Sequence, residues 1–190
     1  MPQRKAGEAY LALPVSQRRD HIRGNPSGAV TLVEYGDFQC PYCGKAYPIV
    51  EKLLKEMGDD IRFVFRNFPL TQIHPDAQLA AEAAESAAAQ GKFWEMHDAL
   101  YENQAALDRQ SLIGYAADLG LNLPQFQLEL TEHTHLPRVK EDFSSGIRSG
   151  VNGTPSFFIN ERRHDGEWDL RSLMAAIEEE MEQEQESEAR

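Results

Sequence analysis

The chain has 190 residues, of which 41% are hydrophobic and 26% charged, proportions that are ordinary for a globular protein. Its formal net charge is −12, and residues 178–190, with seven glutamates and one arginine, carry half of it. This charge excludes the basic footprint of a nucleic-acid-binding protein. No apolar stretch approaches the ~18–20 residues of a membrane span. At this length we expect one large domain, or one domain with an insertion.

The N-terminal stretch, residues 1–21, is expected to form a polar lead-in. It begins with basic residues, but the apolar stretch that follows is short and contains Pro14. No Ala-x-Ala cleavage site comes after it, so we predict that this stretch is not a secretory signal peptide. The sequence therefore predicts a cytoplasmic protein; the alternative is an exported protein whose leader has been removed.

The first half of the chain predicts a strand, a helix and a second strand. Residues 29–35 are apolar and β-branched, which indicates a strand buried on both faces. A helix is expected from Pro41, because proline is favourable at the first helical position, and Gly58 ends it. Residues 61–66 form the second strand. A right-handed crossover through the helix would make the two strands parallel.

Residues 75–149 contain no convincing strand and predict a helical block. Its expected helices lie at 80–89, 93–101, 112–119, 124–130 and 136–147. Strand character returns at 155–160, and a hairpin with a short edge strand follows at 161–166. The last helix is expected to start near Asp169, whose side chain can cap it. Residues 183–190 form an acidic tail.

The only two cysteines, Cys40 and Cys43, enclose Pro41 and Tyr42 at the entrance of the first helix. Residues three apart share a helix face, so the two thiols can close a small disulfide. The free N–H groups of a helix N-terminus favour thiolate over thiol. We predict that Cys40, the exposed cysteine, attacks a substrate disulfide and that Cys43, more buried on the helix, resolves the mixed disulfide. Pro41 and Tyr42 are expected to contact the substrate and to tune the reduction potential. Because tyrosine brings no positive charge, we expect a less oxidising potential than histidine would give at that place.

Two other interpretations of the cysteine pair are a zinc half-site and an inert buried pair. Zinc needs four ligands and the pair supplies two. His133 and His135 could bind a metal weakly, but they lie in a polar loop. Redox chemistry is favoured, so we expect no metal and no cofactor other than a redox-active Cys40–Cys43 disulfide.

Thr154 and Pro155 stand just before the strand at 155–160. Proline removes a ladder donor and is unusual at a central strand, and a cis peptide bond would resolve the conflict. A cis-proline could face the cysteine pair and expose the backbone of Thr154 to an extended substrate. An ordinary trans proline in a loop is the alternative.

Several separated motifs, in this order, resemble the thioredoxin superfamily and specifically its DsbA-like thiol-disulfide oxidoreductases. They are EYGDFQCPYC at 34–43, FRNFPL at 65–70, FWEMH at 93–97 and GTP at 153–155. The resemblance covers about residues 22–180. It implies an α/β, thioredoxin-like fold with a central mixed sheet flanked by helices. This domain would comprise 22–74 and 150–182, interrupted by an inserted all-helical domain at 75–149.

The resemblance also implies roles for individual residues. Cys40 would be the nucleophile, Cys43 the resolving cysteine, Pro155 the cis-proline and Thr154 a residue that shapes substrate contact. Glu34, six residues before Cys40, matches the buried acid that moves protons near the resolving cysteine. From the residues alone, a solvent-exposed carboxylate at a strand end is an equally open interpretation of Glu34.

These features predict an enzyme that exchanges disulfides with the thiols and disulfides of proteins or peptides. We also expect a redox partner, which the sequence does not identify. One alternative is a peptide-binding holdase that uses the cis-proline groove. Another is a glutathione-dependent disulfide reductase, since Cys-Pro-Tyr-Cys also occurs in glutaredoxins. A reducing cytosol would keep the site mostly reduced, which favours the reductase or isomerase direction over the oxidase.

Overall fold

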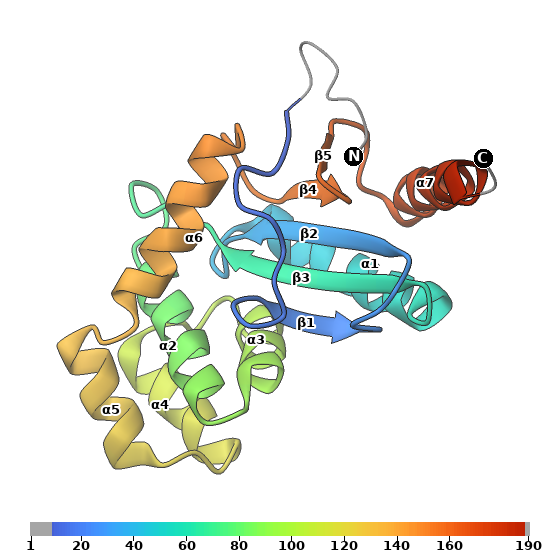
Figure 1. Cartoon of the computed structure of the whole chain (residues 1–190). Coiled ribbons are helices and arrows are strands. Elements are labelled where there is room, and N and C mark those ends of the chain that lie inside the picture. The colour runs from blue at the N-terminus through green and yellow to red at the C-terminus, as the bar shows by residue number, and fades with distance from the viewer. Residues whose placement is uncertain (1–8, 189–190) are drawn as a thin grey trace. The chain divides into compact units, whose positions relative to one another are not determined.

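The computed structural model describes residues 9–188, and the chain divides into two compact units (Figure 1). Of the described residues, the strand unit comprises 9–35, 46–66 and 145–188, and the helical unit comprises 36–45 and 67–144. The turn with the two cysteines therefore belongs to the helical unit. The inserted domain that the sequence places at 75–149 stays a prediction, because compactness alone does not show that a segment folds as a domain.

The strand unit is built on a mixed five-stranded sheet in the order β1-β3-β2-β4-β5. The pairs β1–β3, β2–β4 and β4–β5 are antiparallel, which leaves β2 and β3 as the parallel pair, as expected for strands joined by a helix. The strands are β1 (His21–Gly24), β2 (Val30–Gly36), β3 (Ile61–Asn67), β4 (Ser156–Ile159) and β5 (Arg162–His164).

Burial explains which strands the sequence revealed. All seven residues of β2 and all four of β4 are buried, in agreement with their continuous apolar runs. The strand β1 was missed, because its sequence, HIRG, has no apolar pattern and its residues are half-buried or exposed. It is an edge strand that forms by pairing with β3, with His21 opposite Phe65. A polar edge strand is typical of sheets that avoid pairing with other chains.

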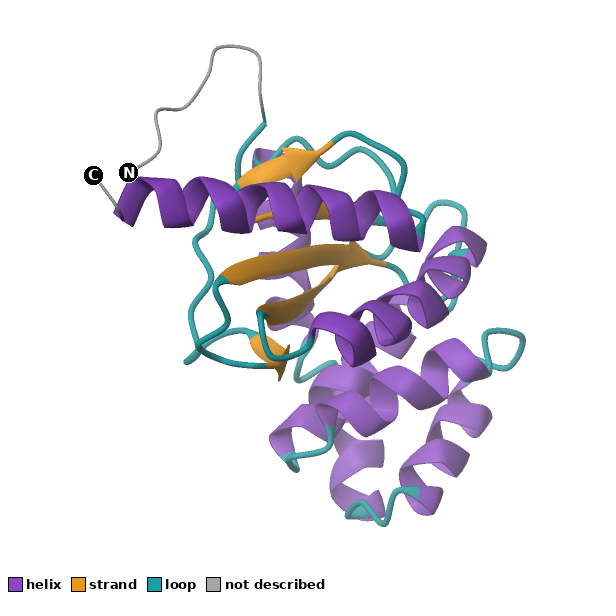
Figure 2. Ribbon diagram, turned by 90° about the vertical axis from the view of Figure 1, so that its right-hand side faces the viewer, coloured by secondary structure: helices purple, strands orange, loops and turns teal. Residues whose placement is uncertain are grey.

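Two long helices accompany the sheet. The helix α1 (Pro41–Met57) begins at the expected proline and contains Pro48. The helix α7 (Leu170–Glu188) lies beside β4, as Figure 2 shows. Asp169 caps α7 as expected, accepting hydrogen bonds from the backbone N–H groups of Arg171 and Ser172. The helix continues into the predicted acidic tail up to Glu188, and the last two residues of that tail lie outside the described residues.

The helical unit packs its helices around α2 (Ala77–Ala89), which contacts α3 (Phe93–Glu102), α4 (Arg109–Asp118) and α5 (Leu123–Glu132). The helix α6 (Leu136–Arg148) follows, and its last residues belong to the strand unit. Four alanines of α2 have no exposed surface: Ala80, Ala83, Ala84 and Ala87. Small side chains let neighbouring helices approach α2 closely from several sides.

Buried carboxylates of the helical unit are paired, as burial of a charge requires. Glu85 accepts a hydrogen bond from Asn67 Nδ2 at 2.7 Å, and Asp142 accepts one from Arg138 Nη1 at 2.6 Å. The carboxylate of Asp142 also accepts from the backbone N–H of Asn67 at 3.1 Å. These contacts hold Asn67 against the helices of this unit.

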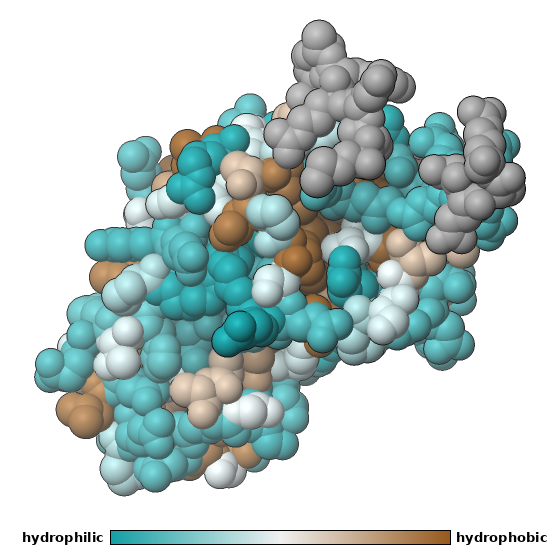
Figure 3. Space-filling model, in the orientation of Figure 1, coloured by the Kyte–Doolittle hydropathy of each residue, from teal (hydrophilic) through white to brown (hydrophobic). Residues whose placement is uncertain are grey.

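The surface is mostly hydrophilic on the face shown in Figure 3. The large hydrophobic side chains that are exposed among the described residues are Tyr42, Ile73, Leu128 and Ile147. Among the helices described here, none combines the length and the apolar character that crossing a membrane requires.

Candidate redox site

Cys40 stands directly before α1 and Cys43 lies in its first turn, so the two residues are adjacent. The carbonyl of Cys40 accepts the N–H of Gly44 at 3.0 Å, which is the first hydrogen bond of the helix. Cys40 thus takes the N-cap position that the sequence predicted. The unpaired N–H groups and the macrodipole of a helix N-terminus stabilise negative charge on a sulfur at this place.

The exposure of Cys40 was predicted wrongly. Cys40 is 3% exposed and Cys43 is 0% exposed, so both are buried, although Cys43 is the more buried of the two, as expected. The turn before α1 folds inward, because the N–H of Cys40 donates to the carbonyl of Asp37 at 3.1 Å. The side chain of Gln104 covers the carbonyl of Cys40, to which its Nε2 donates at 2.9 Å.

The two residues between the cysteines form the exposed part of the site. Pro41 is exposed and Tyr42 is 59% exposed. The ammonium of Lys45 lies 5.5 Å from the centre of the Tyr42 ring. Contact of these two residues with a substrate stays a prediction.

Side chains from distant segments of the helical unit hold residues 37–43, which we call the redox turn. Gln104 Nε2 donates to the carbonyls of both Phe38 and Cys40. Gln39 exchanges two hydrogen bonds with Asp76, at 2.7 and 3.0 Å. The sequence did not reveal these contacts, because Gln104 and Asp76 lie far along the chain from the motif at 34–43 that contains Gln39 and the cysteines.

Asp37 lies within the motif at 34–43, but the sequence predicted no role for it. Its side chain is fully buried, and its Oδ2 accepts from the N–H of Leu70 at 2.8 Å and contacts His74 Nδ1 at 2.7 Å. Its Oδ1 accepts from the N–H of Gln39 at 2.8 Å. Its own N–H points at Cys43 Sγ, 3.5 Å away. A charged residue directly after a buried strand was the signal that could have drawn attention to it.

The remaining predicted site residues lie in the strand unit. Glu34 is 2% exposed and stands opposite Phe157 in the β2–β4 ladder, so it is buried and not at a solvent-exposed strand end. The peptide bond between Thr154 and Pro155 is cis. Because the cysteines belong to the other unit, the approach of Glu34, Thr154 and Pro155 to them stays a prediction.

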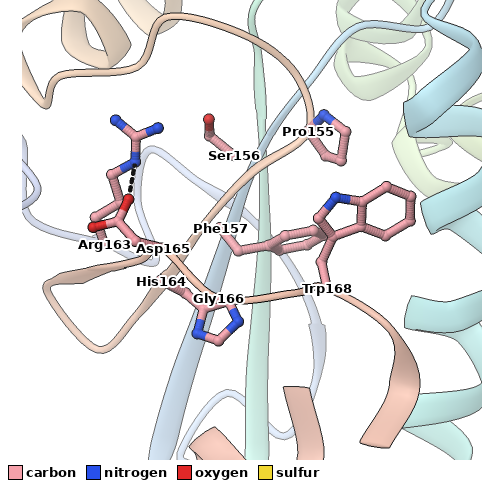
Figure 4. A pocket seen from close by; sticks show the side chains of 8 residues that line it. All are labelled: Pro155, Ser156, Phe157, Arg163, His164, Asp165, Gly166 and Trp168. Atoms are coloured by element: carbon pink, nitrogen blue, oxygen red, sulfur yellow. Dashed lines mark ion pairs between the residues drawn. The ribbon is translucent and has the colours of Figure 1, made fainter. Parts of the chain in front are cut away.

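Pro155 lines a pocket of about 170 Å³ within the strand unit (Figure 4). In this close view the ring of Trp168 lies beside the ring of Phe157, and Pro155 lies above them. On the other side of the pocket, Arg163 Nε and Asp165 Oδ1 form an ion pair at 3.0 Å. The pocket thus offers an aromatic wall near the predicted cis-proline and a polar wall farther away.

Residues 9–188 contain no group of three or more His, Cys, Asp or Glu side chains arranged to hold a metal ion. The sequence suggested His133 and His135 as possible weak metal ligands. In the structure each of them pairs with a glutamate. His133 Nδ1 lies 2.9 Å from Glu82 Oε2, and His135 Nε2 lies 2.9 Å from Glu129 Oε2.

A family model described as Thioredoxin matches residues 16–179. The chain therefore belongs to the thioredoxin family. Its fold is that of the DsbA-like thiol-disulfide oxidoreductases, as the resemblance implied.

The fold assignment rests on similarity to solved structures. The oxidised form of BdbD from Bacillus subtilis has a TM-score of 0.80 at 24% identity and covers 92% of this chain and 99% of its own. Alpha-DsbA1 from Wolbachia pipientis has a TM-score of 0.78 at 21% identity, covering 91% and 95%. A thioredoxin-like oxidoreductase from Silicibacter pomeroyi DSS-3 has a TM-score of 0.76 at 28% identity, covering 85% and 91%.

The curated relatives with similar sequences are much longer proteins. Na⁺/H⁺ antiporter NhaA 1 of Salinispora arenicola is 49% identical over 167 residues, which cover 88% of this chain and 26% of the antiporter. The antiporter NhaA of Herminiimonas arsenicoxydans is 43% identical over 168 residues, covering 88% and 27%. This chain thus spans about a quarter of the length of these relatives, and ion transport is a property given for those proteins.

Proposed function

We propose that this protein exchanges disulfides with the thiols and disulfides of protein or peptide substrates through Cys40 and Cys43. The observation that carries the proposal is the placement of both cysteines at the N-terminus of α1 in a chain of the thioredoxin family. At a helix N-terminus the thiolate, which is the reactive form, is favoured.

The proposed reaction has two steps, written here for substrate reduction. The Cys40 thiolate attacks one sulfur of the substrate disulfide, a bond between Cys40 and the substrate forms, and the second substrate sulfur leaves and takes up a proton. Cys43 then loses its proton and attacks Cys40 Sγ. The bond to the substrate breaks, its sulfur is protonated, and two electrons have passed from the protein to the substrate. The two thiols carry the electrons, so we propose no cofactor. Oxidation of a substrate is the reverse sequence.

We assign supporting roles to five further residues. Pro41 and Tyr42 are exposed beside the cysteines, which supports substrate contact. Thr154 and Pro155 would hold the substrate backbone, and the aromatic pocket next to Pro155 supports this. Glu34 would accept the proton of Cys43, and its burial supports a role that a solvent-exposed carboxylate would not have.

The same pocket favours a second candidate function. A cavity of about 170 Å³ with Trp168 and Phe157 in one wall and Arg163 and Asp165 in another could bind a side chain of an unfolded peptide without any redox step. The protein would then be a peptide-binding holdase.

Activity of two cysteine variants tests the proposal. We expect the wild-type protein to catalyse insulin reduction by dithiothreitol and the Cys40→Ser variant to lose this activity. The Cys43→Ser variant should accumulate a mixed disulfide with the substrate, because the resolving thiol is missing. If the wild type shows no exchange but Cys40→Ser still suppresses aggregation of an unfolded protein, the holdase is correct. Turnover that requires glutathione as reductant identifies the third alternative, the glutathione-dependent reductase.

The reduction potential of the Cys40–Cys43 pair tests the direction of electron flow. The sequence favours the reductase or isomerase direction, which corresponds to a potential near the glutathione poise of a reducing compartment. A much higher potential would identify an oxidase. The cytoplasmic localisation stays a prediction of the sequence.

A further inference from the structure

Asp37 connects the resolving cysteine to a segment of the chain more than thirty residues away. Its backbone N–H points at Cys43 Sγ at 3.5 Å, while its carboxylate is fixed by the segment that leads into α2. Three groups hold this carboxylate. Two are the backbone N–H groups of Gln39 and Leu70, and the third is His74 Nδ1 at 2.7 Å.

His74 is the one side chain among these three donors. Because an ionised carboxylate only accepts hydrogen bonds, His74 Nδ1 carries the hydrogen in this contact. The ring of His74 is 15% exposed and the carboxylate of Asp37 is 0% exposed, so little water competes for the bond. A shielded bond of this kind restricts Asp37 more strongly than an exposed one would.

We propose that Asp37 and His74 act as a positioning pair for Cys43, holding the Asp37 N–H against Cys43 Sγ so that the resolving sulfur is more readily deprotonated. The inference rests on the proposed function and deepens it. An N–H donor stabilises a thiolate more than a thiol, because the charged sulfur is the better acceptor. The step that the pair assists is the second one, in which Cys43 attacks Cys40 Sγ and releases the bound substrate thiol.

The rate of this closure step is the measurement that tests the pair. Reduced protein is mixed with excess oxidised glutathione, which forms the Cys40–glutathione mixed disulfide. Acid quenching and mass spectrometry then follow its decay to the Cys40–Cys43 disulfide. The rate is recorded from pH 5 to pH 10, because it rises as Cys43 loses its proton.

We expect His74→Leu to slow closure at neutral pH by about three- to tenfold, the factor that an ordinary hydrogen bond supplies. Its rate should approach the wild-type value at high pH, where Cys43 is deprotonated in both proteins. His74→Asn should restore most of the rate, because Asn Nδ2 can occupy the place of His Nδ1. If His74→Leu does not fold, His74→Ala replaces it as the variant without a donor.

The matched control is His135→Leu, which removes another partly buried histidine–carboxylate contact of the helical unit. His135 Nε2 lies 2.9 Å from Glu129 Oε2, and its side chain is 20% exposed. This variant should leave the pH profile of closure unchanged. A His74→Leu profile equal to that of the wild type, or slowed uniformly at every pH, overturns the inference while the exchange function stands. A wild type that forms no mixed disulfide overturns the proposed function, and the inference with it.

Discussion

Arg66 has the largest of the fully buried side chains among the described residues. Its positive charge is balanced by an ion pair with Asp20 within the strand unit. Its guanidinium donates to both carboxylate oxygens of Asp20, at 2.9 and 3.1 Å, in the bidentate arrangement that binds most strongly. It also donates to the carbonyl of Leu13 at 2.8 Å and to the hydroxyl of Tyr35 at 3.0 Å. Arg66 thus fastens the N-terminal lead-in to the sheet.

We expect Asp20→Asn to lower the free energy of unfolding by about 3–5 kcal/mol at pH 7, because it leaves a buried guanidinium without its counter-charge. Burial alone raises the pKa of Asp20, but the hydrogen bonds and the charge of Arg66 outweigh it and hold that pKa below its usual value. The carboxylate therefore stabilises the fold above its unfolded pKa, about 3.9, and this contribution is lost as the pH falls through the lower folded-state value.

Urea unfolding at a series of pH values checks this expectation. The difference between the wild type and Asp20→Asn should shrink below about pH 4. The control is Asp165→Asn, because Asp165 pairs with Arg163 while 73% exposed and should change stability by less than about 1 kcal/mol. A difference for Asp20→Asn that stays constant down to pH 2 would show that Asp20 does not act through its charge.

At this scale the sequence revealed the residues whose chemistry depends on local spacing. Two cysteines three positions apart at a helix start are recognisable without a fold. Asp37, His74 and Gln104 were not, because each acts through a partner that chain folding brings to it from a distant segment. The burial of Cys40 was also missed, and one of its partners, Gln104, lies 64 positions along the chain.

At the scale of elements, helices and buried strands followed from periodicity. The five helices expected between residues 75 and 149 occur, with ends that differ from the expected ones by three residues or fewer. The strand β1 could not be found in this way, because an edge strand is defined by its partner β3 and not by an apolar pattern. Local patterns therefore predict elements that bury their own side chains and miss those that depend on pairing.

The helix α2 offers a test of close helix packing. Ala84 has no exposed surface in a helix that contacts α3, α4 and α5, so a larger side chain has no space there. We expect Ala84→Leu to lower the free energy of unfolding by about 1–3 kcal/mol. Ala89→Leu, in the last turn of the same helix and exposed, should change it by less than about 0.5 kcal/mol. Equal effects in urea unfolding would show that packing around α2 is loose.

At the scale of the whole molecule, the residues with proposed roles are distributed over the two units. The cysteines and the Asp37–His74 contact belong to the helical unit, and Glu34, Thr154 and Pro155 belong to the strand unit. Several separated motifs in the expected order were enough to predict the family. The reduction potential of the cysteine pair can be related to the stability of the fold by experiment.

The substitution Tyr42→His tests how the reduction potential and the stability of the fold are related. Tyr42 is 59% exposed, so the substitution should not disturb packing. A histidine that is partly protonated near neutral pH would stabilise the Cys40 thiolate, and therefore the reduced protein. We expect the reduction potential to rise by about 30 mV, which corresponds to about 1.4 kcal/mol for two electrons.

A thermodynamic cycle turns this shift into a statement about the whole fold. In the unfolded chain, residue 42 has little influence on the cysteines, so the oxidised and reduced unfolded forms respond alike to the substitution. The free energy from the higher potential must therefore appear as increased stability of the reduced protein relative to the oxidised one, by about 1.4 kcal/mol. Urea unfolding of both redox forms, with Tyr42→Phe as the uncharged control, measures this difference. A shift in potential without an equal shift in relative stability would mean that Tyr42 also acts on the unfolded chain.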